Sequence, residues 1–199
     1  LKTRVLSFVL AITLAVGLVP MTAVAVKAET VTDISNAAGL KAIEKSGGAY
    51  RLTEDLTLDN WTPIYPSGDF TLDGNGHTIT LSGTKMFESL PKGAVVKNLI
   101  LKGSVSETKN INTGVITGDC KGTIRNCMSS ATVDFKGTSP YIYVGGLAGK
   151  ATGTISNCLV TGKVTAGATP FYGAVTSIAL FESCTIKNCI AVGTDRIAS

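Results

Sequence analysis

From residue 50 onward the chain consists of short runs in which apolar residues alternate with small or polar ones. Within residues 142–166 the runs read IYVGGLAG, GTISNC and GKVTA, with glycines or polar residues between them. Alternation with a period of two is typical of a half-buried strand, and the 3.6-residue spacing of an amphipathic helix is missing. The pattern therefore predicts an all-β chain with three short strands per unit.

The units repeat at a nearly fixed interval. The hexamers GTIRNC (122–127), GTISNC (153–158) and CTIKNC (184–189) are equally spaced, and VKNL (96–99) precedes its equivalent in the first hexamer by a slightly shorter interval. A period of about 31 positions is typical of stacked solenoids. With three strands per turn, the sequence predicts a right-handed parallel β-helix of five to six coils, stacked about 4.8 Å apart.

Stacking in register turns each repeat position into a column. One predicted column is aliphatic and buried, a second consists of amides that hydrogen-bond from coil to coil, and a third is buried and accepts Leu or Cys. The columns are Val96, Ile124, Ile155 and Ile186; Asn98, Asn126, Asn157 and Asn188; and Leu99, Cys127, Cys158 and Cys189. The repetition is thus expected to encode shape.

All five cysteines are predicted to be free thiols. In-register strands hold Cβ atoms about 4.8 Å apart, whereas a disulfide needs about 3.8 Å, and Cys120 and Cys184 do not share a repeat position. Their redox state stays open because the predicted compartment is extracellular. The cysteines show no C-x-x-C pairing and the one histidine, His77, lies coils away, so we expect neither a metal site nor a cofactor.

Residues 1–28 have the layout of a secretory signal peptide. Lys2 and Arg4 precede an apolar run from Val5 to Val19, and small residues lead to a cleavage point after Ala28. A membrane anchor is the alternative, but the run is short for a bilayer span, and no second long apolar segment follows. We therefore expect a protein that is secreted or at the cell surface, with no membrane span after signal removal.

Residues 29–49 are predicted to cap the β-helix. Ser35 or Asn36 begins a short helix over Ala37–Lys45, which would cover the open end of a solenoid core. Residues 50–199 are assigned to the β-helix, which stops part-way through a coil at Ser199. We expect a C-terminally truncated part of a larger protein, whose open strand edges favour self-association of the isolated chain.

Several segments together resemble bacterial surface proteins with GLUG-type repeats. They are GLKAIEKSGGAYRLTEDLTL, NWTPI, TLDGNGHTITL, MFESLPKGAVVKNLIL and VGGLAGKATGTISNC, and the resemblance covers about residues 33–190. It implies a pectate-lyase-like right-handed β-helix in secreted or wall-attached proteins, some of them non-catalytic regions of immunoglobulin A1 proteases or surface adhesins. The Gly-Leu-x-Gly core of the repeat fits well at 146–149, fits loosely at 115–118, and is largely lost in 171–183.

The charge of the mature chain gives no sign of a nucleic-acid partner. The full sequence carries a net charge of +4, but Lys2, Arg4 and Lys27 leave with the signal peptide. The remaining 15 basic and 14 acidic residues leave a net charge of +1. A nucleic-acid footprint would need a clustered basic surface, so we expect none.

Catalysis is the alternative to a binding module, because pectin-degrading enzymes share this fold. Such enzymes need carboxylates clustered on one face or paired across a substrate. The acidic residues do not recur at the repeat period, Asp73 belongs to an Asp-Gly-Asn-Gly turn, and no G-x-S-x-G elbow accompanies His77. Asp134, Asp195 and Arg196 have no visible partners. We expect no catalytic residues, and a polysaccharide-active enzyme stays the alternative.

A binding surface is expected where aromatic residues gather before the first strand of adjacent coils. Tyr141 and Tyr172 occupy the same position of successive repeats, with Tyr143 and Phe171 beside them. Loops on one face of a solenoid are a common place for ligands, and stacked rings suit the apolar faces of sugars. The leading hypothesis is adhesion through a surface glycan or host protein. Shielding of the core edge by these rings is the alternative.

Overall fold

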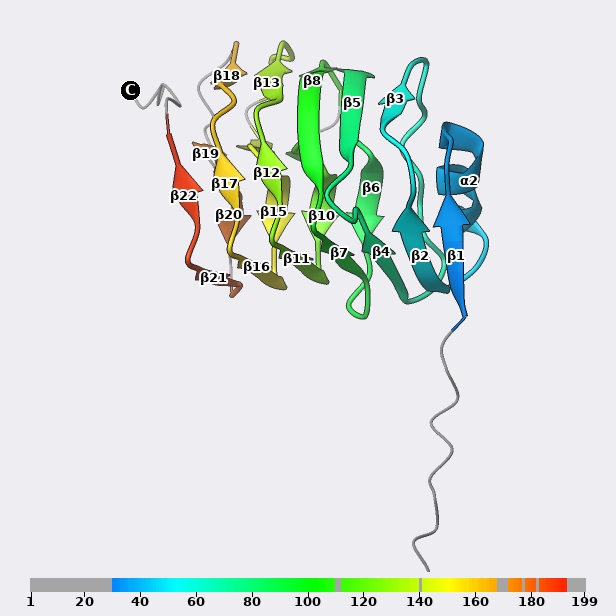
Figure 1. Cartoon of the computed structure of the whole chain (residues 1–199). Coiled ribbons are helices and arrows are strands. Elements are labelled where there is room, and N and C mark those ends of the chain that lie inside the picture. Colours follow the sequence, from blue (N-terminus) through cyan, green and yellow to red (C-terminus); the bar gives the residue numbers. More distant parts are fainter. Residues whose placement is uncertain are drawn as a thin grey trace, which may run out of the picture.

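The computed structural model describes residues 30–109, 112–139, 141–167, 172–176, 178–181 and 183–192. The predicted signal peptide, Phe171, Asp195 and Arg196 therefore lie outside the described residues. The strands stack as successive layers along one axis, from the blue N-terminal end to the red C-terminal end (Figure 1). Every described strand pair is parallel and joins one layer to the next, so the molecule has an all-β, β-helix-like fold.

Sheet A contains one strand from each successive layer, and it carries the hexamer repeat. Thr123 pairs with Thr154 and Ile124 pairs with Ile155, so equivalent residues of successive repeats are direct neighbours in space. Its seven described strands are β1 (Val31–Ile34), β2 (Gly48–Leu52), β4 (Phe70–Asp73), β7 (Val95–Lys97), β11 (Thr123–Arg125), β16 (Thr154–Ser156) and β21 (Thr185–Lys187).

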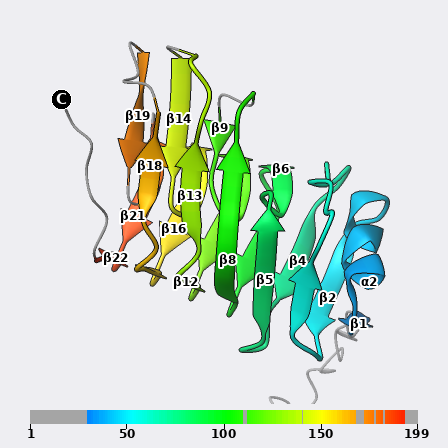
Figure 2. The same ribbon diagram turned by 90° about the horizontal axis from the view of Figure 1, so that it is seen from above.

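Sheet B follows sheet A along the chain and forms a second wall, whose strands lie side by side in Figure 2. The long strand β8 pairs with two shorter strands of the next layer, β12 and β13. The eight described strands are β3 (Leu56–Leu58), β5 (Thr78–Gly83), β8 (Ile100–Glu107), β12 (Met128–Ser129), β13 (Thr132–Phe135), β17 (Leu159–Val160), β18 (Val164–Ala166) and β22 (Ile190–Ala191).

Two smaller sheets complete the described layers. Sheet C contains β6 (Phe87–Leu90), β10 (Thr117–Cys120), β15 (Ala148–Ala151) and β20 (Leu180–Phe181). Sheet D contains β9 (Asn112–Thr113), β14 (Tyr141–Gly145) and β19 (Tyr172–Thr176). In both sheets the partners again come from adjacent coils, as in the pairing of Tyr141 with Tyr172.

The core is the stack of inward side chains that the repeat predicts. Val96, Ile124 and Ile155 are fully buried and pair in order, and Ile186 continues the column as a partly buried residue. In the third column Leu99, Cys127 and Cys158 are buried, while Cys189 is only partly so. Both predicted columns are confirmed, with weaker burial in the last described layer.

The turn from sheet A into sheet B is built by the same residue in four layers. Asn98, Asn126, Asn157 and Asn188 all have left-handed backbones, with φ between 51° and 54°. Asparagine tolerates this conformation better than other side chains that carry a Cβ. Each Nδ2 donates to the preceding Oδ1 at 3.1–3.2 Å, and Asn98 donates to Asp73 Oδ1 at 2.9 Å. The amide column is thus confirmed, and we call it the asparagine turn.

The N-terminal end has one strand more than the sequence predicted. Asn36 begins α2 (Ala37–Lys41) by accepting from the Gly39 N–H at 2.8 Å, and a 3₁₀ turn, η1 (Ala42–Glu44), replaces the last part of the expected helix. Before the helix, β1 pairs with β2 and extends sheet A. Only Ile34 of β1 is buried, so its sequence shows no alternation that would predict a strand.

Candidate functional site

The tyrosines predicted to bind a ligand lie within neighbouring strands of sheet D, and the expectation that they precede the first strand of each coil is wrong. In β14 the buried Ile142 and Val144 alternate with outward Tyr141 and Tyr143, which is the period of a half-buried strand. Tyr141 is 53% exposed and pairs in register with Tyr172 of β19. Phe171 lies outside the described residues. We call Tyr141, Tyr143 and Tyr172 the tyrosine edge.

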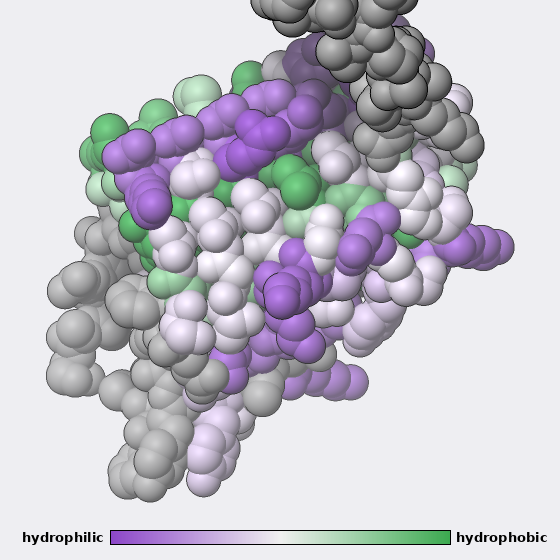
Figure 3. All heavy atoms as spheres, turned by 90° about the horizontal axis from the view of Figure 1, so that it is seen from below, coloured by the Kyte–Doolittle hydropathy of each residue, from purple (hydrophilic) through white to green (hydrophobic). Residues whose placement is uncertain are grey.

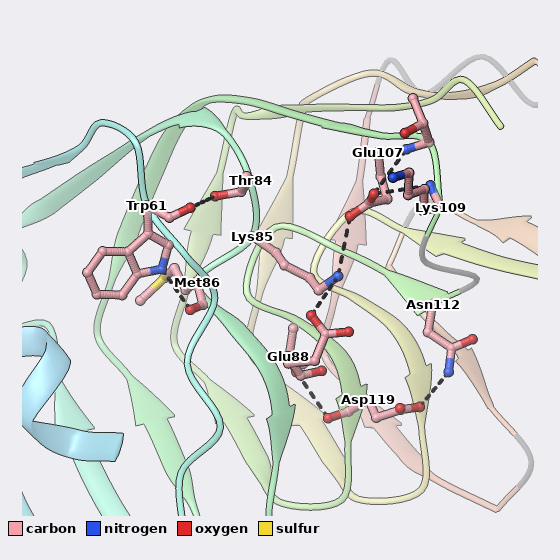
Figure 4. Close-up of polar contacts among 11 residues, drawn as sticks. Trp61, Thr84, Lys85, Met86, Glu88, Glu107, Lys109, Asn112 and Asp119 are labelled. Atoms are coloured by element: carbon pink, nitrogen blue, oxygen red, sulfur yellow. Dashed lines mark hydrogen bonds and ion pairs between the residues drawn. The ribbon is translucent and has the colours of Figure 1, made fainter. Parts of the chain in front are cut away.

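Polar partners border the tyrosine edge at equivalent positions of two coils. Lys150 Nζ lies 5.7 Å from the centre of the Tyr143 ring, within the range of a cation–π contact. One coil earlier, Asn112 Nδ2 donates to Asp119 Oδ1 at 2.8 Å (Figure 4). Since Asn112 pairs with Tyr143 and Asp119 pairs with Lys150, the two contacts occupy the same place in successive layers. The border thus offers a cation, a carboxylate and aromatic surface.

A shallow hollow of about 170 Å³ lies next to this border. Its lining residues are Asp119, Cys120, Lys121, Lys150 and Thr152. Asp119, Lys150 and Thr152 supply a carboxylate, an ammonium group and a hydroxyl, which can hydrogen-bond the hydroxyl groups of a sugar. The hollow is too small for a whole oligosaccharide, and its volume suits a single polar group.

A buried ion cluster lies between two coils, and no pattern in the sequence indicated it. Lys85 is fully buried, and its Nζ lies 3.0 Å from Glu88 Oε2 and 3.6 Å from Glu107 Oε2 (Figure 4). Glu107 also accepts the backbone N–H groups of Thr108 and Lys109. A buried ammonium group requires such carboxylate partners because its desolvation is costly. The cluster ties the segment before β6 to the end of β8.

Asp73 and His77, the residues nearest to a catalytic motif, serve the turns around them. Partial burial opposes ionisation of Asp73, but hydrogen bonds from Asn98 and Lys97 outweigh it and hold the pKa of this carboxyl below its usual value. The backbone N–H of Thr78, with help from His77, likewise lowers the pKa of Asp55. Both carboxylates are therefore held in the ionised form, which is unsuited to proton donation at neutral pH.

Asp134 differs from the expectation that it lacks a partner. Its Oδ1 accepts from Thr165 Oγ1 at 2.7 Å, and its Oδ2 lies 3.7 Å from Lys136 Nζ. Asp134 and Thr165 are register partners on adjacent coils, so the contact is a cross-strand pair that the repeat period could have revealed. Among the described residues, no group of three or more His, Cys, Asp or Glu is placed to hold a metal ion.

The buried thiols are electrostatically unlike one another. Burial raises the pKa of Cys120 to about 12. Contact with the Cys158 side chain, together with burial, raises the pKa of Cys127, and the same contact lowers the pKa of Cys158 to about 7. The thiol of Cys127 donates to the carbonyl of Arg125 at 3.3 Å, and the thiol of Cys158 donates to the carbonyl of Ser156 at 3.2 Å. The buried Cys column is therefore internal packing, in which Cys127 and Cys158 each hydrogen-bond the backbone of their own coil.

A second and larger hollow lies on the outer face of sheet A. It is a groove of about 580 Å³, and its lining residues include Arg51, Thr71, Lys97, Thr123 and Arg125. Figure 3 views the molecule from the side where sheet A lies, and hydrophilic residues (purple) there border residues of intermediate hydropathy (white). Sequence reasoning missed this groove, although Lys97 and Arg125 each directly follow a member of the buried column.

Comparison with known proteins agrees with the repeat and the fold. The GLUG motif matches residues 141–165, which run from β14 to β18. A crystal structure from Bacteroides ovatus, described as a putative immunoglobulin A1 protease, resembles this chain with a TM-score of 0.53 and 22% identity. The match covers 80% of this chain and 67% of that one. The chain thus carries GLUG-type repeats and shares its fold with that protein.

A search of the curated proteins finds no significant match. In the described part of the chain, no helix is long and apolar enough to cross a bilayer.

Proposed function

We propose that the chain is a non-catalytic module of a larger secreted or cell-surface protein, and that it binds a glycan or host surface through the tyrosine edge. In this proposal the fold is a right-handed β-helix of five to six coils. The observation that carries the proposal is the in-register pairing of Tyr141 with Tyr172, with Tyr141 half exposed. The GLUG motif includes Tyr141 and Tyr143, so the matched repeat supplies part of this edge.

The chemistry of the edge supports a sugar ligand. The ring of a tyrosine presents an apolar face that packs against the C–H groups of a sugar, and its hydroxyl stays in water. Adjacent strands of the edge follow the usual spacing of about 4.8 Å, which suits an extended ligand better than a compact one. Lys150 and Asp119 beside the rings supply the polar groups that would fix the orientation of the sugar.

The proposal is tested by glycan-array screening followed by calorimetric titration of the best ligand. We expect Tyr141→Ala to weaken binding by at least about tenfold, which corresponds to about 1.4 kcal/mol. Tyr65→Ala is the matched control, because Tyr65 is 62% exposed and lies outside sheet D. Equal losses in the two variants would contradict the assignment of the site. Release of new reducing ends from the bound glycan would instead support the polysaccharide-active alternative.

A further inference from the structure

A row of charged side chains follows the outer face of sheet A along the described stack. Successive members pair in register. Tyr50 and Leu72 extend the buried column in front of Val96, and each member from Arg51 onward directly follows a residue of this extended column. The members are Asp33, Arg51, Asp73, Lys97, Arg125, Ser156 and Lys187, and we call them the charged row. Alternation across the strand places them outside whenever the column is inside.

The two halves of the charged row differ in net charge. In the first half, Arg51 pairs with Asp33 at 2.8 Å and Lys97 pairs with Asp73 at 2.9 Å, so these four charges cancel. In the second half, Arg125 and Lys187 have no carboxylate within ion-pair distance among the described residues, and Ser156 between them is neutral. Within the described part of the chain, two cations on one face thus lack counter-charges.

A row of mostly hydroxyl-bearing residues runs parallel to the charged row, two residues earlier in each strand. Its members from the third layer onward are Thr71, Val95, Thr123, Thr154 and Thr185. The groove of about 580 Å³ is lined by both rows as far as Thr123 and Arg125, and Ser156 and Lys187 continue the same face beyond its lining. Threonine hydroxyls both donate and accept hydrogen bonds, so they suit a ligand that carries many hydroxyl groups.

From this juxtaposition we propose that the outer face of sheet A binds a linear acidic polysaccharide that lies along the axis of the stack. Arg125 and Lys187 are two layers apart, a separation of about 9.6 Å at the usual strand spacing. That separation is close to the length of a disaccharide, so one acidic group per disaccharide would meet each cation. The guanidinium of Arg125 can hold a carboxylate or a sulfate through two parallel hydrogen bonds.

This site is separate from the tyrosine edge, because the charged row belongs to sheet A and the tyrosines belong to sheet D. The two proposals therefore fail independently. Tyr141→Ala is expected to leave binding of the acidic polysaccharide unchanged, and charge variants of sheet A are expected to leave binding at the tyrosine edge unchanged.

The test is calorimetric titration of the purified chain with three octasaccharides: hyaluronan, chondroitin sulfate and neutral dextran. We expect both acidic ligands to bind and dextran not to bind. Arg125→Gln should weaken the binding about tenfold, as expected for loss of a charge-assisted hydrogen bond. Lys102→Gln is the matched control, since Lys102 is an exposed lysine of β8 in sheet B and should change affinity less than twofold. Tighter binding of chondroitin sulfate assigns sulfate as the preferred group, and tighter binding of hyaluronan assigns carboxylate.

Three results would overturn the proposal. The first is binding of dextran as tight as that of the acidic ligands, which would show that the charges are not used. The second is equal weakening by Arg125→Gln and Lys102→Gln, which would show attraction to the overall charge alone. The third is equally tight binding of a short single-stranded DNA, which would show a general anion surface. Circular dichroism of each variant separates these results from loss of the fold.

Discussion

The asparagine turn and the tyrosine edge belong to the same coils but follow different rules. At the turn, asparagine recurs in four layers with nearly one φ value, and each amide bonds the next. At the edge, the register partners Asn112, Tyr143 and Ala174 are all different, and Asp119 stands opposite Lys150. The turn position holds asparagine in four layers, whereas the outward positions of Asn112 and Asp119 hold a different residue in the next coil. We therefore expect the variable positions of the tyrosine edge to determine which ligand is recognised.

The largest loss of stability is expected for a substitution in the buried aliphatic column. Ile155→Ala removes a fully buried side chain between Ile124 and Ile186, and we expect a loss of about 2–5 kcal/mol in the free energy of unfolding. The outward neighbour Ser156→Ala is the control, with an expected change within about 0.5 kcal/mol. Urea denaturation of both variants measures the difference. Equal midpoints would show that Ile155 does not face the core.

A smaller effect is expected at the asparagine turn. Asn126→Ala removes the amide hydrogen bonds to Asn98 and Asn157. It also places at φ 54° an alanine, which tolerates the left-handed conformation less well than asparagine, so we expect a loss of about 2–3 kcal/mol in the free energy of unfolding. Asn126→Gly loses the same bonds but accepts this backbone conformation, so its loss should be about 1 kcal/mol. Chemical denaturation of the two variants separates backbone strain from the amide bonds. Identical losses would contradict a role for the left-handed conformation.

Residues under strong geometric constraint were the ones that could be predicted from the sequence. The columns of Ile124 and Asn126 were predictable because stacking lets only a few side chains fit, and those residues recur at the repeat period. The cap at Asn36 was predictable because its side chain serves a local hydrogen bond. Strand β1 was not predictable, because three of its four residues are exposed and its pairing with β2 depends on the finished sheet.

The candidate sites likewise contain some residues that the repeat predicts and others that it does not. The register of Tyr141 with Tyr172 followed from their equivalent places in successive repeats. The buried Lys85 cluster did not, because Glu88 and Glu107 come from different coils at positions that do not repeat. The charged row on sheet A did carry a signal, since Lys97 and Arg125 each directly follow a column residue. The proposed role of the charged row depends on which of its cations form ion pairs with carboxylates, and only the side-chain positions in the structure show those ion pairs.

The pH dependence of stability provides a third prediction, for the buried thiol of Cys120 at the end of β10. The folded pKa of Cys120 is about 12, above the unfolded value near 9, so the unfolded chain loses this proton first. The contribution of the protonated Cys120 thiol to the free energy of unfolding is complete below pH 9. It is lost as pH rises toward 12, by up to about 1.4 kcal/mol per pH unit. Denaturation at pH 8, 9 and 10 should show a steeper fall for the parent chain than for Cys120→Ala. Parallel curves would contradict the burial of this thiol.

The smallest effect on stability is expected at the tyrosine edge. Tyr141 is 53% exposed, so Tyr141→Ala should change the free energy of unfolding by less than about 0.5 kcal/mol. The same variant is expected to lose ligand binding, which is the reverse of the pattern at Asn126. Thermal unfolding measures the first part of this statement. A loss as large as that of Asn126→Ala would favour the alternative that the ring shields the edge of the core.

The central claim is that in-register amides of the asparagine turn couple one coil to the next, and a double-mutant cycle tests it most directly. The free energy of unfolding is measured for Asn126→Gly, Asn157→Gly and the double variant, and for the distant pair Asn98→Gly and Asn188→Gly. The account predicts a coupling energy of at least about 0.5 kcal/mol for the neighbours, whose amides bond at 3.2 Å, and additive losses for the distant pair. Additive losses in both cycles would contradict the claim, because they would show that the four asparagines act separately.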